Sequence, residues 1–394
     1  MTPHALEPGR SPRPLEGVRV LDIASLYAAP LAATLLADFG AEVIKVEPPG
    51  GDGFRGTTMW PVVARNKKSI TLDLRQTHGC ELLKELVAHA DVLVENYPAA
   101  VLAKREIGWK ELSARNSDLV MVSVSCFGQT GPYAERPGSG TIGEGFGGLV
   151  HMLGAADGPP LLPSFPLGDA LGAMNAAIGT MMALYWRDAG QSRTARGTAR
   201  GRGQQVDASL YEPVLFAISQ VMARWKPGAA PQRSGSRLAT SAIRNIYATR
   251  DARFVAISAS TERHVVDLVK LAGGTEEAAN LQDADPTVAG WVARHDQASV
   301  VAQLVAARIP IAPVNDVEKL LHDPHIAARK SILRVDDDEL GPLALVQPSP
   351  KLSQTPGAIH TLGAPLSHHN QEVFGGLLGM SRTRMKELQE QKII

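Results

Sequence analysis

The 394-residue chain is poor in cysteine and in aromatic residues, and it carries no excess of charge of either sign. Its two cysteines, Cys80 and Cys126, lie far apart in apolar segments, so we expect no disulfide framework and a cytoplasmic location. Basic and acidic residues both total 40, which argues against a nucleic-acid or membrane-surface protein. No run reaches the roughly 18 apolar residues of a membrane span. We therefore expect small molecules or a second copy of the chain as partners.

Short motifs of several large enzyme classes are also missing. The turn after the first predicted strand, Ala24 to Ala28, has none of the glycines with which a dinucleotide-binding loop approaches a pyrophosphate. There is no G-x-S-x-G elbow, P-loop or H-E-x-x-H motif. His368 and His369 are adjacent and the other histidines are scattered, so no metal site is expected. A nicotinamide dehydrogenase and a metalloenzyme are both disfavoured.

What the chain does have is a regular alternation of strand and helix patterns. At 44% hydrophobic residues it is globular, and its length predicts two or three lobes. Strands are predicted at Gly17–Ile23, Ala41–Val46, Ser69–Leu74, Asp91–Glu95, Leu119–Ser125 and Gln204–Ser209. Helices are predicted at Pro30–Phe39, Glu81–His89, Ala170–Trp186 and Leu210–Arg224. This order indicates βαβ units around a parallel sheet, and hence an α/β fold.

A smaller second lobe is predicted after a Pro/Gly/Ser-rich linker at Pro227–Arg237. Its expected elements are a hairpin at Ile246–Ser258 and helices at Glu262–Leu271 and Ala298–Ala307, followed by a strand at Pro310–Val314 that returns to the first lobe and a final helix at Arg382–Gln391. The basic stretch Gly190 to Gly203 reads as a solvated loop, with a phosphate or partner contact as the alternative.

One acidic residue, Asp169, stands out for its position. It ends the Pro-rich run PSFPLGD, just where the long predicted helix begins. An aspartate at this place is typical of a helix N-cap, which accepts hydrogen bonds from the first N–H groups. The same position also suits a nucleophile, because helix N–H groups keep a carboxylate ionised and oriented.

Four separated segments resemble the class III CoA-transferase family, which includes formyl-CoA transferase, carnitine CoA-transferase and methylacyl-CoA racemase. They are PLEGVRVLDIASLYAAPLAATLLADFGAEVIKVEPPGGD, NKKSITLDL, ADVLVENY and GRGQQVDASLYE. Their order and spacing match the family, and the tail from Pro310 to Ile394 continues the match. The resemblance covers nearly the whole chain after Pro14.

The resemblance implies a Rossmann-like parallel-sheet large domain that binds CoA and is built from both chain ends, together with a smaller α+β domain. The implied division is a flexible arm at 1–14, the first part of the large domain at 15–225, the linker and small domain at 226–310, and a return to the large domain at 311–394. Family protomers interlock like linked rings, so a homodimer is expected.

The implied reaction moves CoA from an acyl-CoA donor, with succinyl-CoA as a candidate, to a small carboxylic or sulfinic acid. Asp169 matches the family's catalytic aspartate, which forms a mixed anhydride with the donor acyl group and then an aspartyl-CoA thioester. Covalent catalysis divides an exchange that one carboxylate does not achieve in a single displacement. No prosthetic group is implied, because the CoA thioester is itself a substrate.

Further residues carry over by position. Leu72, Asn96 and Tyr97 match CoA-contacting residues, and Lys104 or Arg105 falls near a basic residue that contacts phosphate. The candidate substrate pocket comprises Leu26 and Tyr27 after the first strand, and Ser139, Gly140 and Glu144 before the long helix. From its sequence alone, Glu144 reads equally well as a solvated or pocket-polar residue and as a substrate contact.

The chain also departs from the family in two places. Pro48 stands where formyl-CoA transferase has an arginine, and the run of four glycines over that enzyme's active site is absent, so oxalate and formate are disfavoured. Ser139 begins the segment where racemases carry a His-Asp pair, and a serine is a poor base for an α-proton. A CoA-transferase is therefore the first hypothesis. An acyl-CoA racemase or isomerase and a non-catalytic acyl-CoA-binding protein are the alternatives.

Overall fold

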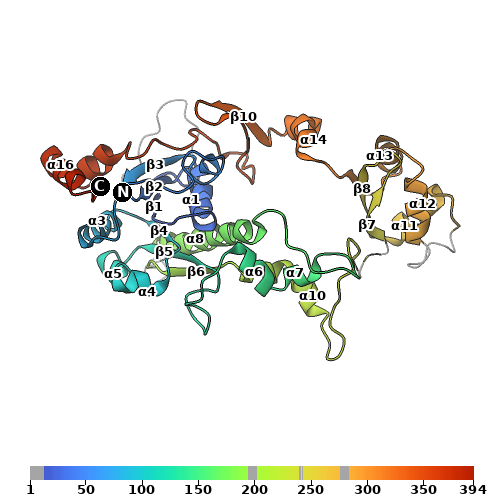
Figure 1. Ribbon diagram of the computed structural model, residues 1–394, viewed down its shortest axis with the longest axis horizontal. Helices are drawn as coiled ribbons and strands as arrows, with labels where there is room; N and C mark the ends of the chain where they lie inside the picture. The colour runs from blue at the N-terminus through green and yellow to red at the C-terminus, as the bar shows by residue number, and fades with distance from the viewer. Residues whose placement is uncertain (1–12, 194–201, 239–240, 242, 276–283) are drawn as a thin grey trace. The chain divides into compact units, whose positions relative to one another are not determined.

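The computed structural model describes residues 13–193, 202–238, 241, 243–275 and 284–394. Its largest element is a six-stranded parallel sheet with strand order β3-β2-β1-β4-β5-β6 (Figure 1). The strands are β1 (Arg19–Asp22), β2 (Glu42–Glu47), β3 (Lys67–Thr71), β4 (Val92–Glu95), β5 (Val120–Ser125) and β6 (Gln205–Ser209). This is the order of a doubly wound Rossmann-type sheet, in which the order reverses between β1 and β4. The predicted α/β fold with a parallel sheet is confirmed.

Helices cover both faces of this sheet. The helices of the sheet unit include α1 (Ala28–Asp38), α2 (Trp60–Val63), α3 (Thr77–Val87), α4 (Ala99–Lys104), α5 (Trp109–Arg115), α6 (Gly140–Phe146), α8 (Leu167–Arg193) and α9 (Glu212–Ala217). A further short helix, α7 (Leu149–Met152), follows α6 in the chain. Figure 1 shows α1 and α8 on one side of the labelled strands, with α3, α4, α5 and α16 (Arg382–Glu390) on the other. Side chains of successive strand residues enter opposite cores, as Val20 and Leu21 of β1 do. Burial on both faces explains the continuous apolar runs of these strands.

The C-terminal segment joins the same unit as the first strands. After the hairpin β10 (Ile332–Asp337) and β11 (Gly341–Val346), the π-helix η3 (Gln371–Leu377) and α16 bury Phe374 and Leu388 in the core that holds α3. Asn370 closes the join, because its side chain accepts the Thr71 backbone N–H at 3.0 Å and donates to the Thr71 hydroxyl at 2.9 Å. The sheet unit is thus built from both chain ends.

A second compact unit consists of Val150–Leu162 and Gln220–Arg329, whereas the sheet unit takes the chain up to Leu149, Pro163–Ser219 and Lys330–Ile394. The second unit contains α10 (Ser219–Ala223), which starts at the boundary, β7 (Ile243–Ala248), β8 (Phe254–Ala259), α11 (Glu262–Leu271), α12 (Ala284–Val292), α13 (Gln297–Ala306), β9 (Ile311–Pro313), α14 (Val317–His322) and α15 (Pro324–Ala328). The unit boundaries therefore differ from the expected ones at 225 and 310. The return to the sheet unit comes at Lys330, 20 residues after position 310.

Two predicted elements of these units are wrong in part. The strand at Pro310–Val314 exists as β9, but it pairs antiparallel with β8 instead of returning to the large sheet. The single helix predicted at Leu210–Arg224 is two short helices, α9 and α10, separated at Ile218. By contrast, the predicted hairpin is present as β7 and β8, and α11 has the predicted bounds.

The long helix α8 also corrects two expectations. The helix extends to Arg193, so the predicted basic loop starts later than Gly190. Residues 194–201 of that loop and most of the predicted N-terminal arm lie outside the described residues. Its segment Leu167–Ala189 is long and apolar enough, at a mean hydropathy of 1.2, to cross a membrane by length and composition. Such a segment had not been expected. A core helix of a soluble protein passes the same test, and α8 packs Ala173 and Ala176 into the sheet core.

Candidate active site

Asp169 is the third residue of α8, which begins at Leu167, so it lies in the first turn and is not the N-cap. The capping interpretation is therefore wrong, although the first turn still favours a negative charge. Asp169 interacts electrostatically with Tyr27, which follows β1, and with Cys126, which follows β5. Cys126 comes directly after the carboxyl end of β5, and Tyr27 ends the loop that leaves the carboxyl end of β1. Doubly wound folds bind their ligands at this edge of the sheet.

The start of α6 is built around the Asp169 carboxylate. Ser139 is the N-cap of α6, and the backbone N–H of Gly140 donates a hydrogen bond to Asp169. A Cβ atom at position 140 would lie 2.1 Å from Asp169 Oδ2, closer than real Cβ atoms come to any neighbour. Glycine at this position therefore allows the N–H group to reach the carboxylate.

Glu144, on the next turn of α6, is buried with an exposure of 1%, so its interpretation as a solvated residue is wrong. Its Oε1 accepts the backbone N–H of Gly168 at 2.7 Å, directly before Asp169 in the chain. Burial raises the pKa of Asp169 above its ordinary range, the bond from Gly140 opposes this rise, and the charge of Glu144 adds to it. The site thus holds two close acidic groups with different partners.

A pocket of about 340 Å³ lies across the carboxyl ends of β1 to β4, and Ser25, one of the residues that line it, is two residues before Tyr27. Of the residues predicted to contact CoA, Leu72, Tyr97 and Arg105 line it. The Arg105 guanidinium lies 5.7 Å from the centroid of the Tyr97 ring. Lys104 ends α4 and is not among the residues that line the pocket, so Arg105 is the better placed of the two basic candidates.

Sequence reasoning missed a second arginine of this pocket, Arg75, which follows β3 and pairs with Asp73 at 2.8 Å. Its side chain is 74% exposed, so the guanidinium can also meet a ligand from solvent. The available signal was position alone, because Arg75 lies three residues after Leu72 in the turn that leaves β3.

The loop after β1 is fixed in an unusual conformation. Leu26 has a φ of 63°, which side chains other than glycine rarely adopt, and it is 65% exposed. Asn96 holds the preceding residue, because its side chain accepts from Ser25 N at 3.0 Å and donates to Ser25 O at 2.8 Å. The structure therefore gives Asn96 a role in shaping the loop, with both ends of its amide engaged by protein.

Buried charged side chains of β1 and β2 form hydrogen bonds with the backbone of this loop. Lys45 donates to the carbonyl of Ala24 and lies 3.3 Å from Asp52, while Lys67 lies 2.7 Å from Asp22. Asp22 also accepts the N–H of Ala24 at 3.1 Å. None of these four charged residues had been predicted to matter.

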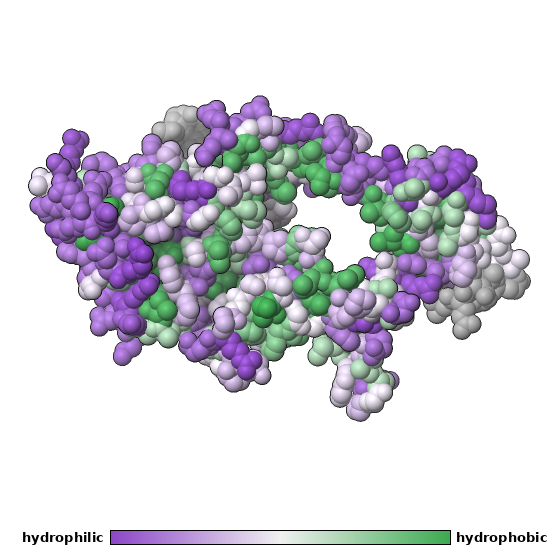
Figure 2. Space-filling view, viewed as in Figure 1, coloured by the Kyte–Doolittle hydropathy of each residue, from purple (hydrophilic) through white to green (hydrophobic). Residues whose placement is uncertain are grey.

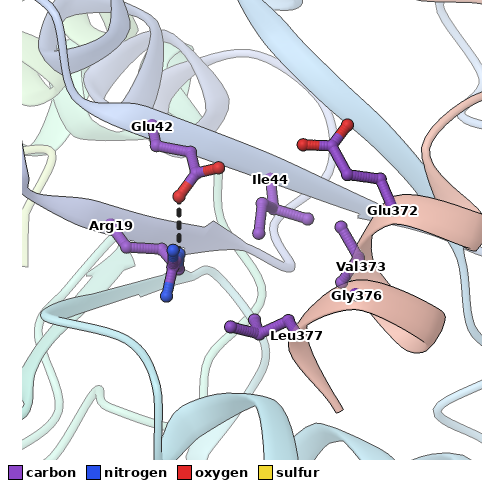
Figure 3. Close-up of a pocket in the computed structure, with 7 residues that line it drawn as sticks. All are labelled: Arg19, Glu42, Ile44, Glu372, Val373, Gly376 and Leu377. Atoms are coloured by element: carbon purple, nitrogen blue, oxygen red, sulfur yellow. Dashed lines mark hydrogen bonds and ion pairs between the residues drawn. The ribbon is translucent and has the colours of Figure 1, made fainter. Parts of the chain in front are cut away.

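A second pocket, of about 290 Å³, lies at the opposite, amino edge of the sheet (Figure 3). Figure 3 shows Arg19 of β1 and Glu42 of β2 turned toward one another, and their Nε and Oε2 atoms are 2.6 Å apart. Lys68 bridges Glu42 and Glu372 of η3, at 2.5 Å from each. Because these charges neutralise one another away from the carboxyl edge, the pocket at the carboxyl ends of β1 to β4 is the better candidate site.

No cluster of three or more His, Cys, Asp and Glu side chains suited to a metal ion occurs within the described residues.

Comparisons with known proteins show the family of the chain. The model of CoA-transferase family III matches residues 15–370. Succinyl-CoA–D-citramalate CoA-transferase of Chloroflexus aurantiacus is 38% identical, over 98% of this chain and 99% of its own length. The beta subunit of succinyl-CoA–L-malate CoA-transferase from the same organism is 36% identical, over 97% and 98%.

Solved structures show the same fold. A CAIB/BAIF family protein of Brucella suis superimposes with a TM-score of 0.78 and 25% identity, covering 93% of this chain and all of its own. A protein of M. tuberculosis gives 0.76 at 24% identity, covering 92% and 99%. The resemblance carried by the four sequence segments is thus confirmed. The chain belongs to CoA-transferase family III.

Proposed function

We propose that this CoA-transferase moves CoA from succinyl-CoA to a small dicarboxylic acid through covalent intermediates on Asp169. The observation that carries the proposal is the placement of Asp169. Its half-buried carboxylate stands in the first turn of α8 and accepts the N–H of Gly140. It also interacts with Tyr27, which lies two residues after Ser25 of the pocket at the carboxyl edge of the sheet. A nucleophile needs this combination of a fixed orientation and an open side.

The chemistry balances as two paired exchanges. An Asp169 carboxylate oxygen attacks the thioester carbon of succinyl-CoA, the C–S bond breaks, and the CoA thiolate leaves a mixed anhydride. The thiolate then attacks the Asp169 carbonyl carbon, the C–O bond breaks, and succinate departs from an aspartyl-CoA thioester. The acceptor carboxylate repeats both steps in reverse, which regenerates the Asp169 carboxylate. One negative charge is passed on at each step, so no external acid or oxidant is needed.

The CoA molecule is proposed to occupy the pocket that Leu72, Tyr97 and Arg105 line. A buried leucine and a tyrosine ring offer an apolar surface for an adenine base, while Arg75 and Arg105 offer cationic groups for phosphates. Leu26, whose φ is 63°, and Tyr27 follow the pocket residue Ser25 directly, and Tyr27 interacts with Asp169, so we place the thiol end of CoA along this loop.

The acceptor class rests on the names of relatives. The names of similar CoA-transferases contain D-citramalate, L-malate, mesaconate or glutarate, which are all dicarboxylic acids. Several of these names also contain succinyl-CoA. We extend that class to this enzyme. We also place the reaction in the cytoplasm, since both cysteines are buried free thiols, and we propose no prosthetic group.

The test of the nucleophile is Asp169→Asn, which keeps size but removes the charge. We expect purified wild-type enzyme to exchange CoA between succinyl-CoA and dicarboxylic acids, and the variant to lose at least about a thousandfold in kcat. Hydroxylamine added during turnover is expected to convert Asp169 alone to a hydroxamate, which peptide mass spectrometry locates. The matched control is Asp188→Asn on the same helix, whose carboxylate pairs with Arg187.

Two results would contradict the proposal. An active Asp169→Asn enzyme, after deamidation is excluded, removes the covalent mechanism. Rapid exchange of the α-proton of a 2-methylacyl-CoA with heavy water, without CoA transfer to any acid, would favour a racemase on the same fold.

We further propose that the enzyme is an interlocked homodimer. On α8, apolar side chains recur at helical spacing on the face opposite the sheet core, and they are 41% to 66% exposed in the single chain. The stripe consists of Met174, Ile178, Met181, Met182 and Tyr185. Figure 2 shows hydrophobic residues over the part of the molecule where Figure 1 places α6 and α8, whereas the surface of α16 is mainly hydrophilic. An apolar stripe of this length indicates an interface.

The occupant that we propose for this stripe is a second copy of the chain, as in the family that the sequence resembles. Light scattering on the purified chain is expected to give the mass of two copies at all concentrations. A relative that is named as alpha and beta subunits suggests the contrary outcome, in which the chain alone stays monomeric and gains activity only with a different subunit.

A further inference from the structure

The surroundings of Glu144 are unusual for an acidic residue. The side chain is 1% exposed, it comes from α6, and its Oε1 reaches across to the Gly168 N–H of α8 at 2.7 Å. In return, the Asp169 carboxylate of α8 accepts the Gly140 N–H of α6. Each of the two helices thus binds a carboxylate of the other at its first turn, and the two carboxylates are held close together.

We propose that Glu144 is a positioning residue whose buried negative charge favours acylation of Asp169 and expels carboxylate products from the site. This inference rests on the proposed function, because it needs Asp169 to alternate between an ionised and an acylated form. It assigns to Glu144 no contact with the substrate.

The physical argument compares the charge of the site before and after acylation. In the resting enzyme two negative carboxylates lie together in a partly buried site, where they repel more strongly than in water. When Asp169 becomes an anhydride or a thioester, its side chain is neutral, and this repulsion ends. The charge leaves on the CoA thiolate and then on the departing acid. Glu144 therefore raises the free energy of the resting state relative to the covalent intermediates.

The same charge acts on free acids in the site. Succinate is released as a carboxylate next to Glu144, and the acceptor must enter as one. Repulsion speeds the departure of the first and weakens the binding of the second. The enzyme therefore gains turnover at the cost of a higher KM for the acceptor.

Other groups near Asp169 do not neutralise this effect. Tyr27 at the start of α1 and Cys126 after β5 interact with Asp169, and burial raises the pKa of each, which keeps both uncharged at neutral pH. The guanidinium that acts on Tyr27 is that of Arg65, and this arginine is held by Asp38 in a bidentate pair.

The acids on β6 and α9 complete this list. Asp207 of β6 and Glu212 of α9 act on each other, and burial followed by the charge of Glu212 raises the pKa of Asp207. Neither of them supplies a positive charge to Asp169.

The test is Glu144→Gln, whose amide oxygen can still accept the Gly168 N–H while the charge is lost. We expect kcat/KM for succinyl-CoA to fall about tenfold, a change that removing one nearby charge can produce. The KM of the acceptor acid is expected to fall as well. The acidic limb of the pH profile is expected to move to lower pH, because the pKa of Asp169 drops when Glu144 no longer repels it.

Two further variants make the result interpretable. In Glu144→Asp the charge remains, so the acidic limb of the pH profile is expected to stay at its wild-type position even if kcat falls. A movement of this limb in Glu144→Asp would overturn the inference. This second variant keeps the inference testable if Glu144→Gln does not fold. Glu135→Gln, an exposed residue that precedes α6, is the surface control.

A Glu144→Gln enzyme that folds but has an unchanged pH limb and an unchanged acceptor KM would overturn the inference and leave Glu144 a structural residue. Failure of the proposed function would give a different result. In that case the wild-type enzyme would not transfer CoA, or the Asp169→Asn variant would remain active.

Discussion

The buried carboxyl group of Glu95 allows a quantitative test of how the stability of the sheet unit depends on pH. It is the last residue of β4, it has no exposed surface, and its Oε2 accepts the Tyr97 N–H at 2.7 Å. Its Oε1 has no hydrogen-bond partner among the described residues. Burial raises the pKa of Glu95 to about 7, against bonds from Ser123 and Tyr97 that lower it, and the charge of Asp207 raises it further.

The magnitude follows from proton linkage. The rise from 4.5 to about 7 is about 2.5 units, and each unit is worth about 1.4 kcal/mol, so ionised Glu95 costs the folded state about 3 kcal/mol. Below the unfolded pKa the group is neutral in both states and costs nothing. As the pH rises through the window between 4.5 and 7, the unfolded chain loses its proton first, and the stability of the folded state declines.

Replacing Glu95 by Gln removes this ionisation. We expect the difference in unfolding free energy between Glu95→Gln and wild type, from urea titrations, to grow by about 3 kcal/mol in favour of the variant from about pH 4.5 to pH 8. The matched control, Glu81→Gln on the exposed side of α3, is expected to show a constant difference. If the Glu95→Gln difference is also constant with pH, the buried carboxyl is not the source of the linkage and the reasoning is refuted.

The sheet was largely predictable because its signal is local. Each strand is a short run of β-branched and aliphatic residues bounded by polar turns, and the following helix shows the longer period. The predicted strands therefore overlap all six strands of the sheet. Helix ends were less accurate: α8 starts at Leu167, before the predicted Ala170, and the Gly168 N–H of its first turn donates to Glu144, which lies 24 positions away in the chain.

Strand partners were not predictable from the short run at Pro310. Three residues of β9 can pair with any open sheet edge, and only the antiparallel partner β8 decides that they belong to the second unit. The hairpin of β10 and β11 was missed for a different reason. Polar Asp336 and Asp337 weaken the alternation, Pro342 has no N–H group for the strand ladder, and the turn depends on Gly341 at a φ of 74°.

The candidate site divides in the same way. The position of Asp169 at the start of the long helix could be predicted from the sequence, and so could the strand-end positions of Leu72 and Tyr97. The partners of Glu144 and Asn96 could not, because each is made by backbone groups distant in the chain, at Gly168 and Ser25. A hydrogen bond to a backbone group does not depend on the type of the partner residue, so the sequence alone does not distinguish a buried acidic residue from an exposed one.

Two substitutions separate packing from chemistry in the sheet unit. Lys67→Met is expected to cost about 3 kcal/mol in urea unfolding, since it leaves the buried Asp22 without its 2.7 Å partner; an unchanged midpoint would show that the pair is dispensable. Gly140→Ala is expected to reduce kcat at least about a hundredfold, because the added methyl group would collide with the Asp169 carboxylate and displace it from the N–H that orients it. Stability is expected to change far less than activity, as the first turn of α6 can shift by a fraction of an ångström without unpacking the sheet. A Gly140→Ala enzyme of normal kcat would mean that this N–H group does not hold the nucleophile during turnover.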